Sequence, residues 1–181
     1  MKILVTGKNG QVGHELMRSL APLGQVVGVD VKECDLAQSA AIDALLERVK
    51  PDIIINPAAY TEVDKAESEP TIAHAVNVQA PKLLARYAAR HNIPIIHFST
   101  DYVFDGTKAT AYVETDEPHP LSVYGATKRA GEQAAATAAR SPVITSHDSA
   151  LRRSGRLKVT STAPGVRRTS SSSLTRGRVP S

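Results

Sequence analysis

Cysteine is nearly absent from this chain of 181 residues, and apolar runs long enough to cross a membrane are absent altogether. The single cysteine, Cys34, excludes an internal disulfide, and it has no cysteine or histidine partner at metal-ligand spacing, so we expect a buried thiol. The longest apolar runs are strand-sized, whereas a spanning helix needs about 20 residues. A secretory signal would begin with basic residues, followed by an apolar stretch and a cleavage site, and the sequence shows no such pattern. We therefore expect a cytoplasmic protein that does not insert into a membrane.

Acidic residues are scarce in one part of the chain only. Residues 141–181 hold eight lysines and arginines against one acid, Asp148, and this net charge of +7 within a whole-chain charge of +4 leaves −3 for residues 1–140. The same segment has ten serines, five threonines and no aromatic residue, a composition that predicts a disordered tail. Attraction to a polyanion would concern this tail alone. Because it lacks interleaved aromatics and a recognisable module, we do not expect a nucleic-acid partner.

The apolar content, 41% of the chain, is sufficient for one domain with a core. Apolar runs rich in β-branched residues alternate with longer segments of helical period, which is the pattern of a parallel sheet covered on both faces. We predict an α/β fold with a Rossmann-like, doubly wound parallel sheet. The expected strands are 2–6, 25–30, 52–56 and 93–99, and the expected helices are 10–24, 39–49, 71–91 and 124–139.

Three glycines follow the first expected strand directly. Gly7, Gly10 and Gly13 stand in GKNGQVG before a helix, where a tight turn needs glycine and the helix N-terminus offers free N–H groups to a pyrophosphate. The second strand ends in Asp30, close to the expected distance for a carboxylate that binds the adenosine ribose. Glycines that serve only the turn and the packing of the helix are the alternative. The spacing predicts an NAD(P)-binding Rossmann domain over residues 1–140.

The choice between NADH and NADPH stays open at the level of sequence. Asp30 would accept hydrogen bonds from a free 2′-hydroxyl and repel a 2′-phosphate, whereas Lys8 or Lys32 would neutralise that phosphate. Asp35 and Leu36 are candidate contacts for the amino group and the face of adenine, and an ordinary loop acid is the alternative reading of Asp35.

A tyrosine and a lysine stand four residues apart where the last expected helix begins. Residues four apart share a helix face, so the ammonium of Lys128 is expected near the phenol of Tyr124, although such a pair also arises by chance. A phenol with a pKa of about 10 needs roughly 4 kcal/mol of differential stabilisation to titrate near neutrality. One cation in a dry site, together with an oxidised nicotinamide, is able to supply it. Tyr124 would then protonate a carbonyl oxygen that receives hydride, while Thr100, at the end of the fourth strand, holds that oxygen.

Five ordered motifs resemble the extended short-chain dehydrogenase/reductases, and among them the reductases of dTDP-linked 4-keto sugars. The motifs are GKNGQVG, NPAAYTEVDKAESEP, AVNVQA, HFSTDYVFDG and VYGATKRAGE, and they cover residues 1 to about 139. The resemblance implies hydride transfer from NADPH or NADH to the 4-keto group of dTDP-4-dehydro-L-rhamnose, a step in polysaccharide precursor synthesis. A homodimer and a requirement for Mg²⁺ are implied by the resemblance alone, and no metal ligands are identified in the chain.

The resemblance also assigns roles to individual residues. It makes Thr100, Tyr124 and Lys128 the catalytic triad. It also makes Thr100 and Asp101 contacts of the substrate. Asn77 would hold a water behind Lys128, and a helix-packing asparagine is the alternative. Around the cofactor, besides Gly7, Gly13, Tyr124 and Lys128, it places Gly10, Gln11, Val12, Asp30, Asp35, Leu36, Ala58, Ala59 and Tyr60.

The chain departs from the family pattern in two places. Pro57 stands where the family more often has alanine, which is harmless in a loop at a strand end. After residue 140 the next strand and the sugar-binding portion of the family are missing, and the serine-arginine segment stands in their place. We interpret this loss of pattern as a shifted reading frame or an early end, and we expect marginal stability and a missing dimer interface.

Two classes of function compete on these observations. The complete set of Thr100, Tyr124 and Lys128 favours an NAD(P)H-dependent reductase, whose activity in a shortened chain is open. The alternative is a non-catalytic NAD(P)-binding regulatory module or a broken gene fragment, since the regulatory subunit of methionine adenosyltransferase is similar to these reductases. A binding module has no use for a tuned phenol, so we favour the reductase.

Overall fold

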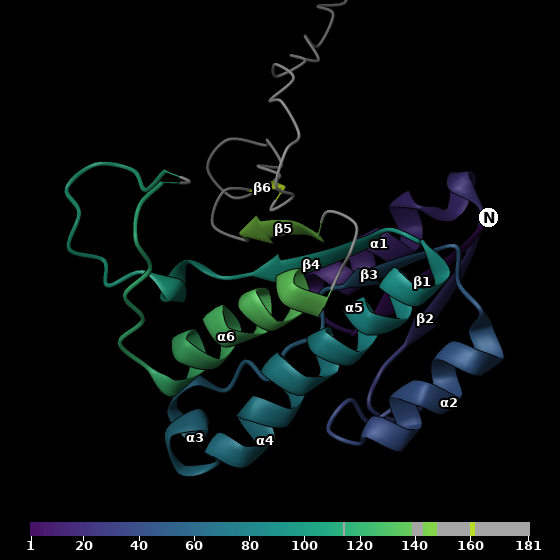
Figure 1. The fold of residues 1–181 in the computed structure, drawn as a ribbon, viewed down its shortest axis with the longest axis horizontal. Helices are drawn as coiled ribbons and strands as arrows, with labels where there is room; N and C mark the ends of the chain where they lie inside the picture. The colour runs from purple at the N-terminus through teal and green to yellow at the C-terminus, as the bar shows by residue number, and fades with distance from the viewer. Residues whose placement is uncertain (114, 139–142, 148–159, 162–181) are drawn as a thin grey trace, which may run out of the picture.

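A computed structural model of the chain describes residues 1–113, 115–138, 143–147 and 160–161. Its centre is a sheet with the strand order β2-β1-β3-β4-β5-β6 (Figure 1). The strands are β1 (Lys2–Thr6), β2 (Gln25–Val29), β3 (Ile53–Asn56), β4 (Ile95–Ser99), β5 (Val143–His147) and β6 (Thr160–Ser161). The helices are α1 (Gln11–Ser19), α2 (Ser39–Val49), α3 (Val63–Ser68), α4 (Pro70–His74), α5 (Ala80–His91) and α6 (Val123–Ala138).

The strands from β2 to β5 run parallel, and β6 pairs antiparallel with β5. Their apolar, β-branched sequences suit strands that are buried on both faces. In β1, for example, Ile3, Leu4 and Val5 are all buried. Strand order reverses at β1, where β2 lies on one side and β3 on the other. In open α/β sheets this reversal opens a crevice at the carboxyl ends of the strands, which is where ligands bind.

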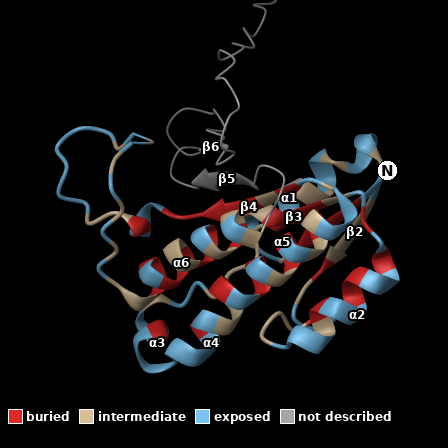
Figure 2. Cartoon of the chain, in the orientation of Figure 1, coloured by how far each residue is buried: buried red, intermediate tan, exposed pale blue. Residues whose placement is uncertain are grey.

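Helices cover both faces of the sheet. On one face, α2 and α5 contribute Leu45, Leu46 and Leu84 to a core that also includes Leu4 and Ile54. Figure 2 shows buried residues, in red, along the sheet and on parts of these helices. Ala135 of α6 belongs to the same core. On the other face, α1 packs its apolar stripe against β1, β3 and β4. The expected Rossmann-like α/β fold is confirmed.

The sheet continues beyond the fourth predicted strand. β5 pairs in parallel with β4, with Val143 opposite Ile95 and His147 opposite Ser99. The sequence predicts a disordered tail from residue 141, whereas the structure has a strand at Val143–His147, because a composition rich in serine, threonine and arginine gives little sign of a strand with only two adjacent apolar residues. Apart from β5 and β6, the tail prediction lies outside the described residues.

The helical region predicted over 71–91 is interrupted. It consists of α4, a π-helical turn (Ala75–Gln79) and α5, and α3 precedes it as an additional short helix. A π-helical turn inserts one residue and commonly marks a functional site. Asn77 lies in this turn with 1% of its surface exposed.

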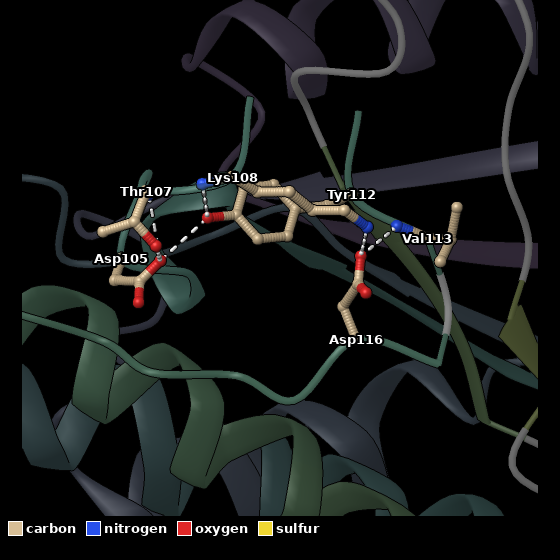
Figure 3. A network of polar contacts seen from close by, with 6 residues as sticks. All are labelled: Asp105, Thr107, Lys108, Tyr112, Val113 and Asp116. Carbon is tan, nitrogen blue, oxygen red and sulfur yellow. Dashed lines mark hydrogen bonds and ion pairs between the residues drawn. The ribbon is translucent and has the colours of Figure 1, made fainter. Parts of the chain in front are cut away.

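The segment between β4 and α6 projects from the carboxyl end of the sheet (Figure 1) and is held by its own polar contacts (Figure 3). Asp105 Oδ1 accepts hydrogen bonds from the hydroxyl of Tyr112 at 2.8 Å and from the backbone N–H of Thr107 at 3.1 Å. Lys108 Nζ pairs with Asp116 Oδ2 at 2.6 Å. Contacts within the segment therefore determine its shape.

Within the described part of the chain, no helix has the length and apolar character needed to cross a bilayer.

Candidate active site

The glycine loop between β1 and α1 forms the floor of a cleft. Gly7 has a left-handed backbone with φ of +63°, and a Cβ on Gly13 would lie 1.9 Å from the Gly7 carbonyl oxygen. A side chain is therefore excluded at Gly7 and at Gly13, and the first N–H groups of the helix stay accessible. Gly10 caps the helix without a side chain.

A cavity of about 550 Å³ lies over this loop, at the point where strand order reverses. Its size is in the range of cofactor sites. Of the predicted cofactor residues, the cavity is lined by Gly7, Gly10, Gln11, Val12, Gly13, Asp30, Asp35, Leu36, Ala58, Ala59 and Tyr124. The residues that sequence reasoning did not assign to it are Thr6, Val29, Val31, Cys34, Pro57, Thr61, Val76 and Phe98. The donor set, a glycine loop at a helix N-terminus with a carboxylate beyond the second strand, fits a dinucleotide.

Asp30 joins the glycine loop to the turn after β2. Its Oδ2 accepts the N–H of Asn9 at 2.9 Å, and its Oδ1 accepts the N–H of Val31 at 2.8 Å. The carboxylate is thus fixed at the cavity wall, and each oxygen keeps lone-pair capacity for a ribose hydroxyl. Asp35 accepts the N–H of Ala37 at 2.9 Å, which is a local turn contact in addition to its place in the cavity wall.

Tyr60 does not line the cavity that its neighbours Ala58 and Ala59 line. Its hydroxyl donates to Glu69 at 2.5 Å, and this contact raises the pKa of Tyr60 to about 12. Its backbone is bound by Asn77, which accepts the Tyr60 N–H at 2.8 Å and donates to the Tyr60 carbonyl at 3.2 Å. Asn77 also donates to Thr127 Oγ1 at 3.1 Å, so its side chain ties the loop after β3 to α6.

Tyr124 and Lys128 are both buried on α6. Tyr124 is 8% exposed and lines the cavity, and its ring packs edge-to-face with that of Tyr102 at 5.5 Å between centroids. Lys128 is 2% exposed, and its Nζ donates to the carbonyl oxygen of Phe98 at 2.6 Å. Burial lowers the pKa of Lys128 to about 8, and the charge of Glu132 opposes this shift. Lys128 is not among the residues that line the cavity.

Thr100 lies at the end of β4 and is 6% exposed. Its Oγ1 accepts the N–H of Tyr102 at 3.3 Å and donates to Asp101 Oδ1 at 3.3 Å. It caps the short 3-10 turn Asp101–Val103, which leads toward α6. The carboxyl end of β4 therefore brings Thr100 to the same end of the sheet as the glycine loop, as parallel strands require.

Sequence reasoning missed a buried acid, Glu132, one turn beyond Lys128. One carboxylate oxygen accepts from the Ser99 hydroxyl, and the other pairs with Arg129 Nη1 at 2.8 Å. Glu132 is 8% exposed, so its charge acts on Lys128 through a poorly solvated interior. The signal that could have found it is the spacing of four residues from Lys128, which repeats the spacing of Tyr124 and Lys128.

A second missed feature is a polar chain across the sheet. Thr6 donates to Asn56 Oδ1 at 2.5 Å, and Asn56 Nδ2 lies 3.0 Å from His97 Nδ1. All three side chains are fully buried, and His97 Nε2 has no hydrogen-bond partner in the described part of the chain. Burial, together with the charge of Lys128, lowers the pKa of His97 well below its usual value, so the imidazole is neutral. These three side chains connect Thr6, which lines the cavity, to His97, whose pKa is affected by the charge of Lys128.

Comparisons with known proteins identify the family of the chain. The family model described as the RmlD substrate binding domain matches residues 1–146. The chain belongs to this family. It is 52% identical over 136 residues to the dTDP-4-dehydrorhamnose reductase of Burkholderia thailandensis, a match over 75% of this chain and 46% of that protein.

Solved structures of two relatives share the fold. The dTDP-4-dehydrorhamnose reductase of Clostridium acetobutylicum is 39% identical with a TM-score of 0.73, over 77% of this chain and 50% of that one. The reductase of Bacillus anthracis, solved in complex with NADP, is 34% identical with a TM-score of 0.71, over 76% of this chain and 50% of that one. The chain thus spans about half the length of the relatives that it matches.

Among the described residues, no group of three or more histidine, cysteine, aspartate or glutamate side chains is placed to hold a metal ion. The expectation of Mg²⁺ rests on the resemblance to the family and has no counterpart in the described site.

Proposed function

We propose that residues 1–140 form the cofactor-binding half of an NAD(P)H-dependent reductase that acts on the 4-keto group of dTDP-4-dehydro-L-rhamnose, in the cytoplasm. The observation that carries the proposal is the position of Tyr124 in the wall of the cavity above the glycine loop, with Lys128 buried one turn behind it. The named activity of the similar reductases, and the NADP in one of them, support it.

The bound nicotinamide would supply hydride to the carbonyl carbon. Gly10 and the N-terminus of α1 would bind the pyrophosphate, and Asp30 would accept hydrogen bonds from the adenosine ribose. Thr100 would orient the carbonyl oxygen by a hydrogen bond, and Tyr124 would donate its phenolic proton to that oxygen. Because the pKa of Lys128 is about 8, its ammonium predominates at neutral pH and would stabilise the phenolate that forms.

Absorbance of the reduced nicotinamide tests this function directly. Purified chain is mixed with NADPH or NADH and dTDP-4-dehydro-L-rhamnose, and oxidation is followed. We expect slow oxidation that is lost in Tyr124→Phe, while that variant still binds the cofactor. Oxidation at the same rate in Tyr124→Phe would refute the role of the phenol.

A cofactor-binding module without turnover is the second candidate, and the observation that favours it is the position of the Lys128 ammonium, which donates to the carbonyl oxygen of Phe98 and does not line the cavity. Binding of NADH or NADPH with no oxidation under the same assay would support this candidate over the reductase.

A further inference from the structure

An ion pair stands beside Asp30 at the end of β2. Lys8 Nζ lies 2.8 Å from Glu33 Oε1, with the two side chains 28% and 43% exposed. The other oxygen of Glu33 accepts the backbone N–H of Asp30 at 2.9 Å. An exposed ion pair is weak by itself, about 0 to 1 kcal/mol. The hydrogen bond from the Asp30 N–H, however, holds the Glu33 carboxylate beside Asp30 whether or not Lys8 is paired with it.

The cavity wall at this end is acidic. Asp30 lines the cavity, and its carboxylate is fixed by the N–H groups of Asn9 and Val31. Neither Lys8 nor Lys32 is among the described residues that line it. A cofactor ribose at Asp30 would therefore meet one carboxylate directly and a second one, Glu33, close behind it.

The two forms of the cofactor respond to this wall in opposite ways. A free 2′-hydroxyl donates a hydrogen bond to a carboxylate, whereas a 2′-phosphate brings nearly two negative charges and requires a cation. Lys8 is a described candidate, because its side chain reaches Glu33, whose other carboxylate oxygen accepts the Asp30 N–H. While Glu33 neutralises Lys8, the site offers that phosphate two carboxylates and no unpaired ammonium at Lys8.

We propose that Glu33 determines cofactor specificity: by holding Lys8 and adding a second negative charge behind Asp30, it selects the cofactor with a free 2′-hydroxyl. The inference rests on the proposed function only in requiring that the cavity takes a dinucleotide. The fold of the family does not settle the preference, since the structure of the Bacillus anthracis relative contains NADP.

Equilibrium binding to the intact chain tests the proposal without turnover. Dissociation constants for NADH and NADPH are measured by nicotinamide fluorescence at physiological ionic strength. We expect NADH to bind at least about tenfold more tightly than NADPH. In Glu33→Gln, whose amide oxygen still accepts the Asp30 N–H, we expect NADPH affinity to rise by about three- to tenfold and NADH affinity to change by less than about twofold.

Two further variants isolate the cause. Glu47→Gln removes an equal charge from an exposed position on α2 and should leave both affinities within about twofold of the parent. The double variant Lys8→Gln, Glu33→Gln should lose most of the gain for NADPH, because the freed ammonium is then missing.

Three results would overturn the proposal. These are tighter binding of NADPH than of NADH by the parent chain, an unchanged NADPH-to-NADH ratio in folded Glu33→Gln, or a gain for NADPH that survives in the double variant. Each of them leaves the cofactor cavity standing, because a dinucleotide still binds. Failure of both dinucleotides to bind would instead remove the cavity's proposed role and this inference together.

Discussion

The ammonium of Lys128 is held where it costs folding free energy. Burial lowers its pKa from 10.5 to about 8, and at pH 7 the folded protein must keep a buried cation that the unfolded chain would hydrate. The unfolded chain binds more protons than the folded one between about pH 8 and 10.5, so this group makes stability rise with pH in that window. Across this window the group raises the free energy of unfolding by about 3 kcal/mol.

Substitution of Lys128 by methionine exposes this cost. We expect the wild-type chain to gain about 3 kcal/mol in free energy of unfolding relative to Lys128→Met as pH rises from 7 to 10.5. Urea unfolding at several pH values measures it, and the difference between the two chains cancels the titration of other groups. Lys82→Met, at an exposed position on α5, is the matched control and should show no such trend. A flat difference for Lys128 would contradict a buried ammonium.

Glu132 opposes the loss of that ammonium. Its carboxylate raises the pKa of Lys128, so Glu132→Gln should lower the Lys128 pKa further below 8. Chemical shifts of ¹³Cε-labelled lysine, followed against pH, report this titration directly. Ser99→Ala removes a hydrogen bond from Glu132 but keeps its charge, and the Lys128 pKa should then stay near its parent value. Equal titration in the parent and Glu132→Gln would show that Glu132 acts only through packing.

Strands and helices with strong periodicity were predicted closely from sequence, and the polar interior was not. The predicted helix over 39–49 is α2 residue for residue, because its apolar positions repeat with one helical period. The π-helical turn at Ala75–Gln79 was missed because one inserted residue hardly changes that pattern. His97 and Ser99 share a strand face with apolar Ile95, and such alternation says nothing about whether a polar residue is buried.

The π-helical turn sets how closely α6 approaches it. A Cβ on Gly131 would lie 2.0 Å from the Asn77 carbonyl oxygen, so the two backbones are in direct contact. Helix propensity alone predicts that Gly131→Ala stabilises the chain by about 1 kcal/mol. We expect the opposite, a destabilisation of about 2 kcal/mol or more, because the turn or α6 must shift. Denaturant unfolding decides the sign, and stabilisation by alanine would contradict the close contact.

The chain as a unit places the cavity over the glycine loop where several segments far apart in the sequence converge, and a ligand there would stabilise them together. The ends of β1, β2 and β4, the glycine loop, the loop after β3, the π-helical turn and the start of α6 all contribute to its wall. A ligand that binds only the folded state, at 100 times its dissociation constant, adds about 2.7 kcal/mol to the free energy of unfolding. For a chain of this size we expect NADH to raise the midpoint of thermal unfolding by roughly 5 to 10 °C. Nicotinamide mononucleotide lacks the adenosine ribose that Asp30 would bind, so it should raise the midpoint much less at equal concentration. An equal shift from the mononucleotide would show that the acidic end of the cavity contributes nothing to binding.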